Sequence, residues 1–313
     1  MDFAESFPDE YDILNGWDWN TDCFNLYSVD GESTDNVNQN NIYFIADTHL
    51  GRNIFGHWMW EVALFLPFYK YYKVAFPNLK LLLYSSRNFK KNTLKDFNIG
   101  EDDIIYSKCF PYNEEQGHVF PDEPFNSYKM IVPKFTFLPS TGIEHPFFLK
   151  LLKIFRFHYK IPENPEKKIN ITYFIRSRKE NWCSDFNNLD NLEAYRKFIN
   201  FDKFLELIKK YNIYICDIDN LSSIKEQVEI VYSSKNIIIE FGSAHTINGC
   251  FFAKNSNFLI LNDIGLGSVH TELLNKCYEN NNLTTEIFQS TDDWTRINID
   301  LVAFENRLKE IMD

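Results

Sequence analysis

The chain has 313 residues, enough for one large or two medium domains with a substantial core. Its formal net charge is −12, but the first 51 residues hold 11 acidic residues and no Lys or Arg, so the rest is nearly neutral, which argues against nucleic-acid binding. The chain shows no apolar run of membrane-span length, no secretory signal and no CxxC pair, so we expect a non-secreted, cytoplasmic protein with Cys216 and Cys250 as core thiols.

Residues 1–40 read as an acidic N-terminal segment, and residues 41–160 as a first α/β domain. Apolar and alternating runs predict strands and one helix there: strands at Ile42–Ala46, Leu79–Tyr84, Ile104–Tyr106 and within Tyr128–Leu138, and a helix at Phe147–Tyr159. Pro162 and Pro165 then bracket a charged linker, which we take as the domain boundary.

The stretch Gly56–Tyr72 predicts a largely apolar helix that Pro67 should kink or restart. Its buried face is formed by apolar residues at helical spacing: Trp58, Val62, Phe65 and Tyr69. His57 and Glu61 are i, i+4 neighbours at the start of this helix. Either they form a functional pair, or His57 caps the helix and Glu61 is a surface or structural residue.

Residues 168–313 predict a second α/β domain in which strands and helices alternate. The strands are Ile169–Ile175, Ile213–Cys216, Ile237–Glu240 and Phe258–Leu261, and the helices are Phe201–Tyr211, Ser222–Ser233, His245–Ala253 and Ile299–Met312. This alternation favours a parallel sheet covered on both faces. Ligands of such sheets bind beyond the carboxyl ends of the strands.

Polar groups follow the predicted strands at that edge. Gly242, Ser243, Ala244 and His245 form a turn between a strand and a helix N-terminus, which is either a phosphate site or an ordinary turn with a Ser cap. Arg176 and Arg178 follow Ile169–Ile175 and are either diphosphate ligands or surface arginines.

Two further groups are candidates for binding a ligand. Gln227 lies at the edge of the inner face of its helix and needs a partner, either a backbone carbonyl or a ligand such as a ribose or base. Asp217-Ile-Asp219 resembles the Asp-x-Asp signature that holds a divalent ion beside a diphosphate. No P-loop, nucleophile elbow or GxGxxG is present.

Three segments together resemble glycosyltransferase family 61, which contains plant xylosyltransferases, protein O-linked N-acetylglucosaminyltransferases and many capsular and viral relatives. The segments are Asn53–Glu61, Tyr173–Arg178 with Arg196–Asn200, and Glu226-Gln227 with Glu240–Asn248. The chain departs from the family pattern at the turn, where Gly242 stands in place of a His and Ser243 in place of a Gly. Some bacterial relatives carry Gly-Ser there, and His245 lies close by.

The resemblance implies a GT-B-like α/β fold, in which two Rossmann-like domains face each other across a cleft. It implies inverting transfer from a nucleotide sugar, which we take as a UDP-sugar, to a hydroxyl of a glycan or protein glycan, with no essential metal or cofactor. The C-terminal domain would bind the donor through the residues named above and Asn248. The N-terminal domain would bind the acceptor and supply the base, for which His57, Glu61 and Asp47 are candidates, with His49 behind them. The resemblance also implies a viral or bacterial source and reduces Asp217-Ile-Asp219 to a loop.

Two other functions stay open from the residues alone. One is a metal-dependent nucleotide-sugar transferase that uses Asp217 and Asp219. The other is a nucleotide-sugar-binding or scaffold protein without catalytic activity.

Overall fold

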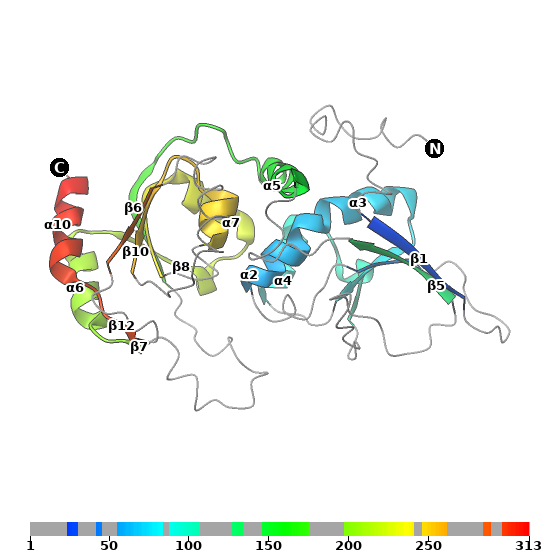
Figure 1. The fold of residues 1–313 in the computed structure, drawn as a ribbon, viewed down its shortest axis with the longest axis horizontal. Coiled ribbons are helices and arrows are strands. Elements are labelled where there is room, and N and C mark those ends of the chain that lie inside the picture. Colours follow the sequence, from blue (N-terminus) through cyan, green and yellow to red (C-terminus); the bar gives the residue numbers. More distant parts are fainter. Residues whose placement is uncertain are drawn as a thin grey trace. The chain divides into compact units, whose positions relative to one another are not determined.

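The computed structural model of the chain describes residues 24–30, 42–45, 55–83, 88–106, 127–133, 146–175, 197–240, 246–261, 284–288 and 296–312. They belong to two compact units, one within residues 1–159 and the other within residues 160–313. Each unit contains its own five-stranded sheet, shown in Figure 1. The fold is therefore mixed α/β, and the arrangement of two domains across a cleft stays a prediction.

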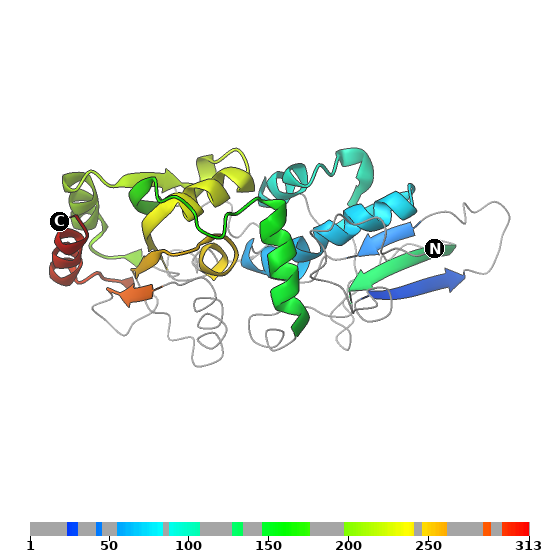
Figure 2. The same cartoon turned by 90° about the horizontal axis from the view of Figure 1, so that it is seen from above.

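The sheet of the first unit has the strand order β1-β5-β2-β3-β4. Its strands are parallel except for β1, which pairs antiparallel with β5, as Figure 2 shows. The strands are β1 Phe24–Asp30, β2 Ile42–Ile45, β3 Leu79–Leu83, β4 Ile104–Tyr106 and β5 Ser127–Pro133. The helical segments are α2 Phe55–His57, η3 Trp58–Val62, η4 Ala63–Phe65, α3 Leu66–Ala75, α4 Asn88–Asp96, η5 Glu101–Asp103 and α5 Pro146–His158.

Most predicted elements of this unit are confirmed, with two additions. β4 has the predicted bounds, and β2, β3 and α5 lie within one or two residues of theirs. The sequence does not predict β1, because acidic and Asn-rich stretches lie on either side and its alternation stops after Phe24 and Leu26, at Ser28. It does not predict α4 either, because that helix is largely polar.

The predicted helix Gly56–Tyr72 is divided into four segments. A short α-helix passes into the π-helix η3 and the 3₁₀-helix η4 before α3 begins at Leu66. Pro67 lies in the first turn of α3, where its missing N–H needs no partner, so the predicted restart is confirmed. The prediction of one buried face is too narrow, because residues 58–69 are buried on all sides.

The sheet of the second unit is parallel throughout and has the order β11-β10-β9-β6-β8. The strands are β6 Ile169–Ile175, β7 Lys197–Phe198, β8 Tyr214–Asp217, β9 Ser234–Ile239, β10 Asn257–Ile260, β11 Thr284–Ile287 and β12 Arg296–Ile297, with β7 and β12 forming a separate pair. The helical segments are α6 Phe201–Lys210, η8 Ile218–Asn220, α7 Ile224–Ser233, η9 Asn248–Phe252 and α10 Leu301–Met312. The predicted parallel sheet is thus confirmed.

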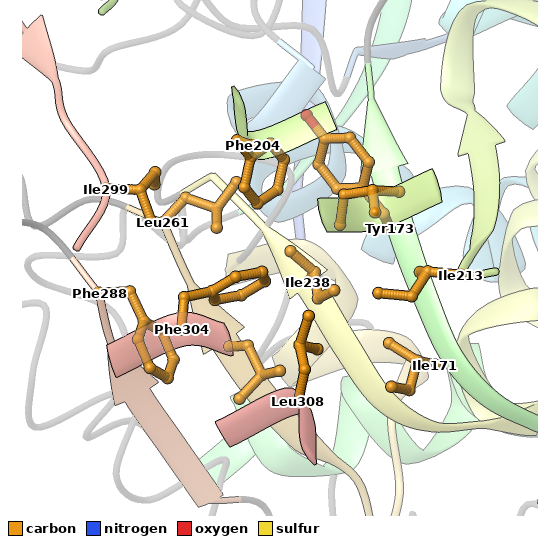
Figure 3. Close-up of a cluster of buried hydrophobic side chains, with 12 residues drawn as sticks. Ile171, Tyr173, Phe204, Ile213, Ile238, Leu261, Phe288, Ile299, Phe304 and Leu308 are labelled. Atoms are coloured by element: carbon orange, nitrogen blue, oxygen red, sulfur yellow. The ribbon is translucent and has the colours of Figure 1, made fainter. Parts of the chain in front are cut away.

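The main core of the second unit lies between its sheet and the helices α6 and α10. Phe204 of α6 and Phe304 of α10 are fully buried and pack against Tyr173, Ile238 and neighbours, as Figure 3 shows. Helix α7 covers the opposite face (Figure 1). Both faces of the sheet are therefore closed, which leaves the strand ends as the place for a ligand.

Strand β9 begins three residues before its predicted start because buried polar residues continue it. Asn236 donates from Nδ2 to the backbone oxygen of Asn170 at 3.0 Å, and Asn257 donates from Nδ2 to Oδ1 of Asn236 at 2.9 Å. Ser234 is buried beside Thr172, with 2.6 Å between the two hydroxyl oxygens. These side chains satisfy one another across adjacent strands, so polar residues are tolerated inside the sheet.

Two further expectations from the sequence concern the buried cysteines and membrane-spanning helices. Cys216 and Cys250 are free and buried, as predicted, and burial raises the pKa of Cys216 to about 12. No helix in the described ranges combines the length and apolar character that crossing a membrane requires.

Candidate active site

His57 and Glu61 are joined by a side-chain hydrogen bond in the first unit. His57 Nδ1 donates to Oε1 of Glu61, whose side chain is only 2% exposed, while the imidazole of His57 is 25% exposed. A carboxylate on Nδ1 fixes the tautomer that carries its lone pair on Nε2. Nε2 has no hydrogen-bond partner among the described residues. The partly exposed ring can therefore accept a proton at Nε2.

The bond lies in an unusual local helix. Glu61 lies in the π-helix η3, and the backbone N–H of Ala63 closes this turn on the carbonyl of Trp58. π-Helical turns are rare and often lie at functional sites. The sequence also allowed His57 to cap the helix and Glu61 to be a surface residue. Glu61 is buried, so its surface placement is wrong, and the His57 side chain makes no capping bond at the start of η3.

Gln227 and Asn248 form a second buried polar pair, in the second unit. Gln227 Nε2 donates to Oδ1 of Asn248 at 2.7 Å, and the two residues are 1% and 0% exposed. One partner of Gln227 is thus a side chain, which we did not consider, while the second proton of Nε2 and the amide oxygen remain available to a ligand. The Nδ2 group of Asn248 is buried and has no partner among the described residues. Buried donors are normally hydrogen-bonded, so an acceptor on a bound ligand is a candidate partner for this group.

Asn248 also begins a π-helix, η9, whose turn is closed by the N–H of Ala253 on the carbonyl of Asn248. The pairs in both units therefore involve a residue of a π-helix. Period-3.6 reasoning from sequence cannot show this, because the apolar pattern of a five-residue π-turn looks like that of an α-helix.

The start of α7 is fixed by a capping arrangement that also orients Gln227. Ser223 Oγ accepts from the backbone N–H of Glu226 at 3.1 Å. The carboxylate of Glu226 accepts from the N–H of Ser222 at 2.9 Å. Glu226, which belongs to the Glu-Gln segment of the resemblance, therefore has a structural role, while the adjacent Gln227 reaches Asn248.

The carboxyl ends of three strands meet at one edge of the second sheet. Ile175 of β6 pairs with Asp217 of β8, and Tyr173 of β6 pairs with Ile238 of β9. The remaining predicted site residues lie outside the described residues: Asp47, His49, Arg176, Arg178, Gly242, Ser243, Ala244 and His245. Arg176 directly follows Ile175, so its place in the sequence keeps it a candidate for this edge.

Two other predicted groups have partners within the protein. Asp217 ends β8 and accepts from Asn220 Nδ2 at 2.6 Å, and the residues after it form a 3₁₀-helix, so the expected loop at Asp217-Ile-Asp219 is wrong. Asn200 makes two bonds with the backbone of Ile299, donating at 2.8 Å and accepting at 3.1 Å. Asn200 therefore joins α6 to the C-terminal part of the chain.

The protein-family model for Glycosyltransferase 61 matches residues 55–259, more than half of the chain. The chain belongs to glycosyltransferase family 61. It is therefore a glycosyltransferase, as the three sequence segments suggest. A search of curated proteins returns no match.

The match to family 61 takes in both polar pairs, His57–Glu61 and Gln227–Asn248, whereas Asp47 precedes it. Sequence reasoning misses the buried residues that contact Trp58, which lies between His57 and Glu61 in the sequence. Thr93 and Lys90 are both fully buried on α4, a helix that its polar composition conceals. A Lys followed three residues later by a Thr carries no sequence signal for burial.

Proposed function

We propose that the protein catalyses inverting transfer of a sugar from a UDP-sugar to a hydroxyl of a glycan, without an essential metal ion. One observation carries the proposal: in a family 61 chain, the His57–Glu61 bond leaves Nε2 of a partly exposed imidazole without a partner among the described residues. A His held on Nδ1 by a buried carboxylate is suited to act as a general base.

The reaction is a single displacement. The acceptor oxygen forms a bond to the anomeric carbon while the bond from that carbon to the phosphate oxygen breaks. UDP leaves with the electron pair, and the hydroxyl proton passes to Nε2 of His57. Glu61 stabilises the imidazolium that results, and the anomeric configuration is inverted because attack comes from the face opposite the phosphate.

On the donor side, the second unit would bind the nucleotide at the carboxyl edge of its sheet. Arg176 and Arg178 would stabilise the diphosphate as its charge develops, together with the turn from Gly242 to His245. The Nδ2 of Asn248, which has no partner among the residues that the structure describes, supports this assignment, because an acceptor on the donor nucleotide would satisfy it. In this proposal the two units face each other as in a GT-B fold.

The experiment uses UDP-xylose and UDP-N-acetylglucosamine, the sugars named by the activities of the resembled family, with GDP- and CMP-sugars beside them. A donor at a hundred times its Kd should stabilise the protein by about 2.7 kcal/mol, which thermal unfolding measures. Proton NMR of the product from an α-linked donor should show a β-anomer. An α-product would exclude inversion, and no stabilisation by any nucleotide sugar would exclude the donor class.

The cellular compartment of the enzyme is part of the same proposal. Neither Cys216 nor Cys250 forms a disulfide in the structure, which fits a reducing compartment. We therefore propose that the enzyme acts in the cytoplasm. Fractionation of the source cells, with the activity as the marker, tests this.

A further inference from the structure

The residue that follows His57 is held by a polar chain from α4. The indole of Trp58 is fully buried, and its Nε1 donates to Oγ1 of Thr93 at 3.1 Å. The hydroxyl of Thr93 in turn donates to the backbone oxygen of Phe89 at 2.7 Å. Because a hydroxyl has one proton, its use toward Phe89 leaves a lone pair of Thr93 for Trp58. The two bonds therefore fix each other's direction.

The same helix also contacts the rings on both sides of His57. Lys90 Nζ lies 4.9 Å from the centre of the Trp58 ring. The ring of Phe89 lies 5.8 Å from that of Phe55 and 6.4 Å from that of Trp58. Phe55 and Trp58 flank His57 in the sequence, so α4 holds the backbone of His57 from both sides.

Trp58 is linked to Glu61 through the π-turn. The carbonyl of Trp58 accepts the N–H of Ala63, which closes the five-residue turn that contains Glu61. A rotation of Trp58 about the helix axis would shift this carbonyl, and the carboxylate of Glu61 would move relative to Nδ1 of His57. Trp58 itself is buried and does not reach solvent.

We propose that Thr93, acting through Trp58, is a positioning residue that holds Glu61 on His57. The inference rests on the proposed function of His57 as the base. Loss of the Thr93–Trp58 bond leaves the imidazole less often in the tautomer with a free Nε2. Transfer slows while donor binding, which involves the second unit, is unchanged.

The test compares variants that remove the same bond from its two ends. Thr93→Val removes the acceptor, Trp58→Phe removes the donor, and Thr93→Ser keeps the acceptor. Release of UDP from UDP-N-acetylglucosamine or UDP-xylose, whichever stabilises the protein, gives kcat and KM, with water as the acceptor. Thr93→Val and Trp58→Phe should each lower kcat roughly ten- to a hundredfold with unchanged KM, and Thr93→Ser should restore the rate.

A matched control removes another buried hydroxyl bond from the same unit. Tyr69 Oη donates to the backbone oxygen of Leu79 at 3.3 Å, and Tyr69→Phe should lower the melting temperature without lowering kcat. In a Glu61→Ala background, Thr93→Val should cause no further loss of kcat, because the acceptor that it positions on Nδ1 of His57 is already absent. For wild type, ¹⁵N NMR of the imidazole should show a proton on Nδ1 of His57, a measurement that needs no folded variant.

Three results would overturn the inference: a loss of kcat in Thr93→Val no larger than in Tyr69→Phe, losses that multiply in the double variant, or a proton on Nε2 in wild type. These failures are distinct from failure of the proposed function. If His57→Ala abolishes transfer while Thr93→Val does not affect it, only the positioning role is lost. If His57→Ala retains full transfer, the base assignment is lost as well.

Discussion

At the residue scale, the Gln227–Asn248 pair combines a satisfied group with an unsatisfied one. Oδ1 of Asn248 accepts from Gln227, whereas its Nδ2 is buried without a partner among the described residues. Leaving a buried polar group unpaired costs about 1–3 kcal/mol. Such a cost is retained at functional sites, where a ligand completes the hydrogen bonding.

Substitutions of this pair separate stability from binding. Gln227→Met leaves Oδ1 of Asn248 unpaired too, so the free energy of unfolding should fall by about 1–3 kcal/mol. The double variant Gln227→Met with Asn248→Leu replaces both amides by apolar groups, so calorimetry should show most of the stability restored. UDP affinity should fall in both variants. A double variant as unstable as the single one, or with wild-type UDP affinity, would contradict this account.

His158 gives the protein a specific acid sensitivity. Burial lowers the pKa of His158 to about 4, and its ring is stacked on Phe97 with 3.8 Å between the centroids. An unfolded His has a pKa near 6.5. As the pH falls from 6.5 toward 4, the unfolded chain gains a proton that the folded chain does not, so stability is complete above pH 6.5 and decreases below it.

The expected decrease from His158 is about 1–2 kcal/mol, after allowance for its remaining solvent contact. Replacing His158 with Phe removes the titration and keeps a ring on Phe97. Denaturant unfolding at several pH values between 4 and 7 should give a shallower decline for His158→Phe than for wild type. Parallel declines would show that His158 does not titrate as proposed.

At the element scale, the accuracy of a predicted strand depends on how uniformly apolar the residues of that strand are. Strand β6 is an apolar run, and both its ends are predicted correctly. Strand β9 is predicted short because Ser234 and Asn236 are polar, and their partners on neighbouring strands are not visible in sequence. The candidate His57–Glu61 pair could be predicted from i, i+4 spacing, whereas the pairing of Gln227 with Asn248 needs the third dimension.

Lys167 joins elements of the second unit at the end of the sheet opposite the candidate site. Its Nζ donates to the carbonyl of Tyr232 at the end of α7 and to Oγ of Ser256 before β10, at 2.8 Å each, and also to the carbonyl of Lys254. Burial lowers the pKa of Lys167 to about 8. This one amine therefore satisfies acceptors from two segments distant in sequence.

Replacement of Lys167 by Met should lower the free energy of unfolding by about 2 kcal/mol, because hydrogen bonds from a charged group are lost and their acceptors are left unpaired. The matched control is Lys168→Met, since the side chain of Lys168 is 68% exposed and contacts only Glu166 at 3.5 Å among the described acids. Urea unfolding should show little change for the control. Equal effects of the two substitutions would exclude the role of Lys167.

At the scale of the whole molecule, family membership and site geometry support each other. Family 61 identifies the chain as a glycosyltransferase, and each unit contributes one polar pair that involves a π-helix. The sequence could indicate the family from three short segments and the α/β class from strand–helix alternation. It could not indicate the π-helices, which arise from packing and carry no periodicity of their own.

The proposed independence of a metal ion concerns the whole reaction. If Arg176, Arg178 and the turn stabilise the leaving diphosphate, donor turnover in excess EDTA should equal turnover in Mn²⁺. UDP release measured in both conditions tests this. Loss of activity in EDTA with recovery in Mn²⁺ would favour the metal-dependent transferase, and Asp217→Asn and Asp219→Asn would then be the variants to compare.

We propose that this family 61 transferase uses His57, held by Glu61, as its base. The most direct measurement compares donor affinity by calorimetry with turnover of the same UDP-sugar in wild type, His57→Ala and Glu61→Gln. The account predicts that both variants bind the donor as wild type does, that His57→Ala lowers kcat about 10²–10⁴-fold, and that Glu61→Gln lowers it in the same direction. Wild-type kcat in both variants would contradict the claim, and the base would have to be sought at Asp47 or His49.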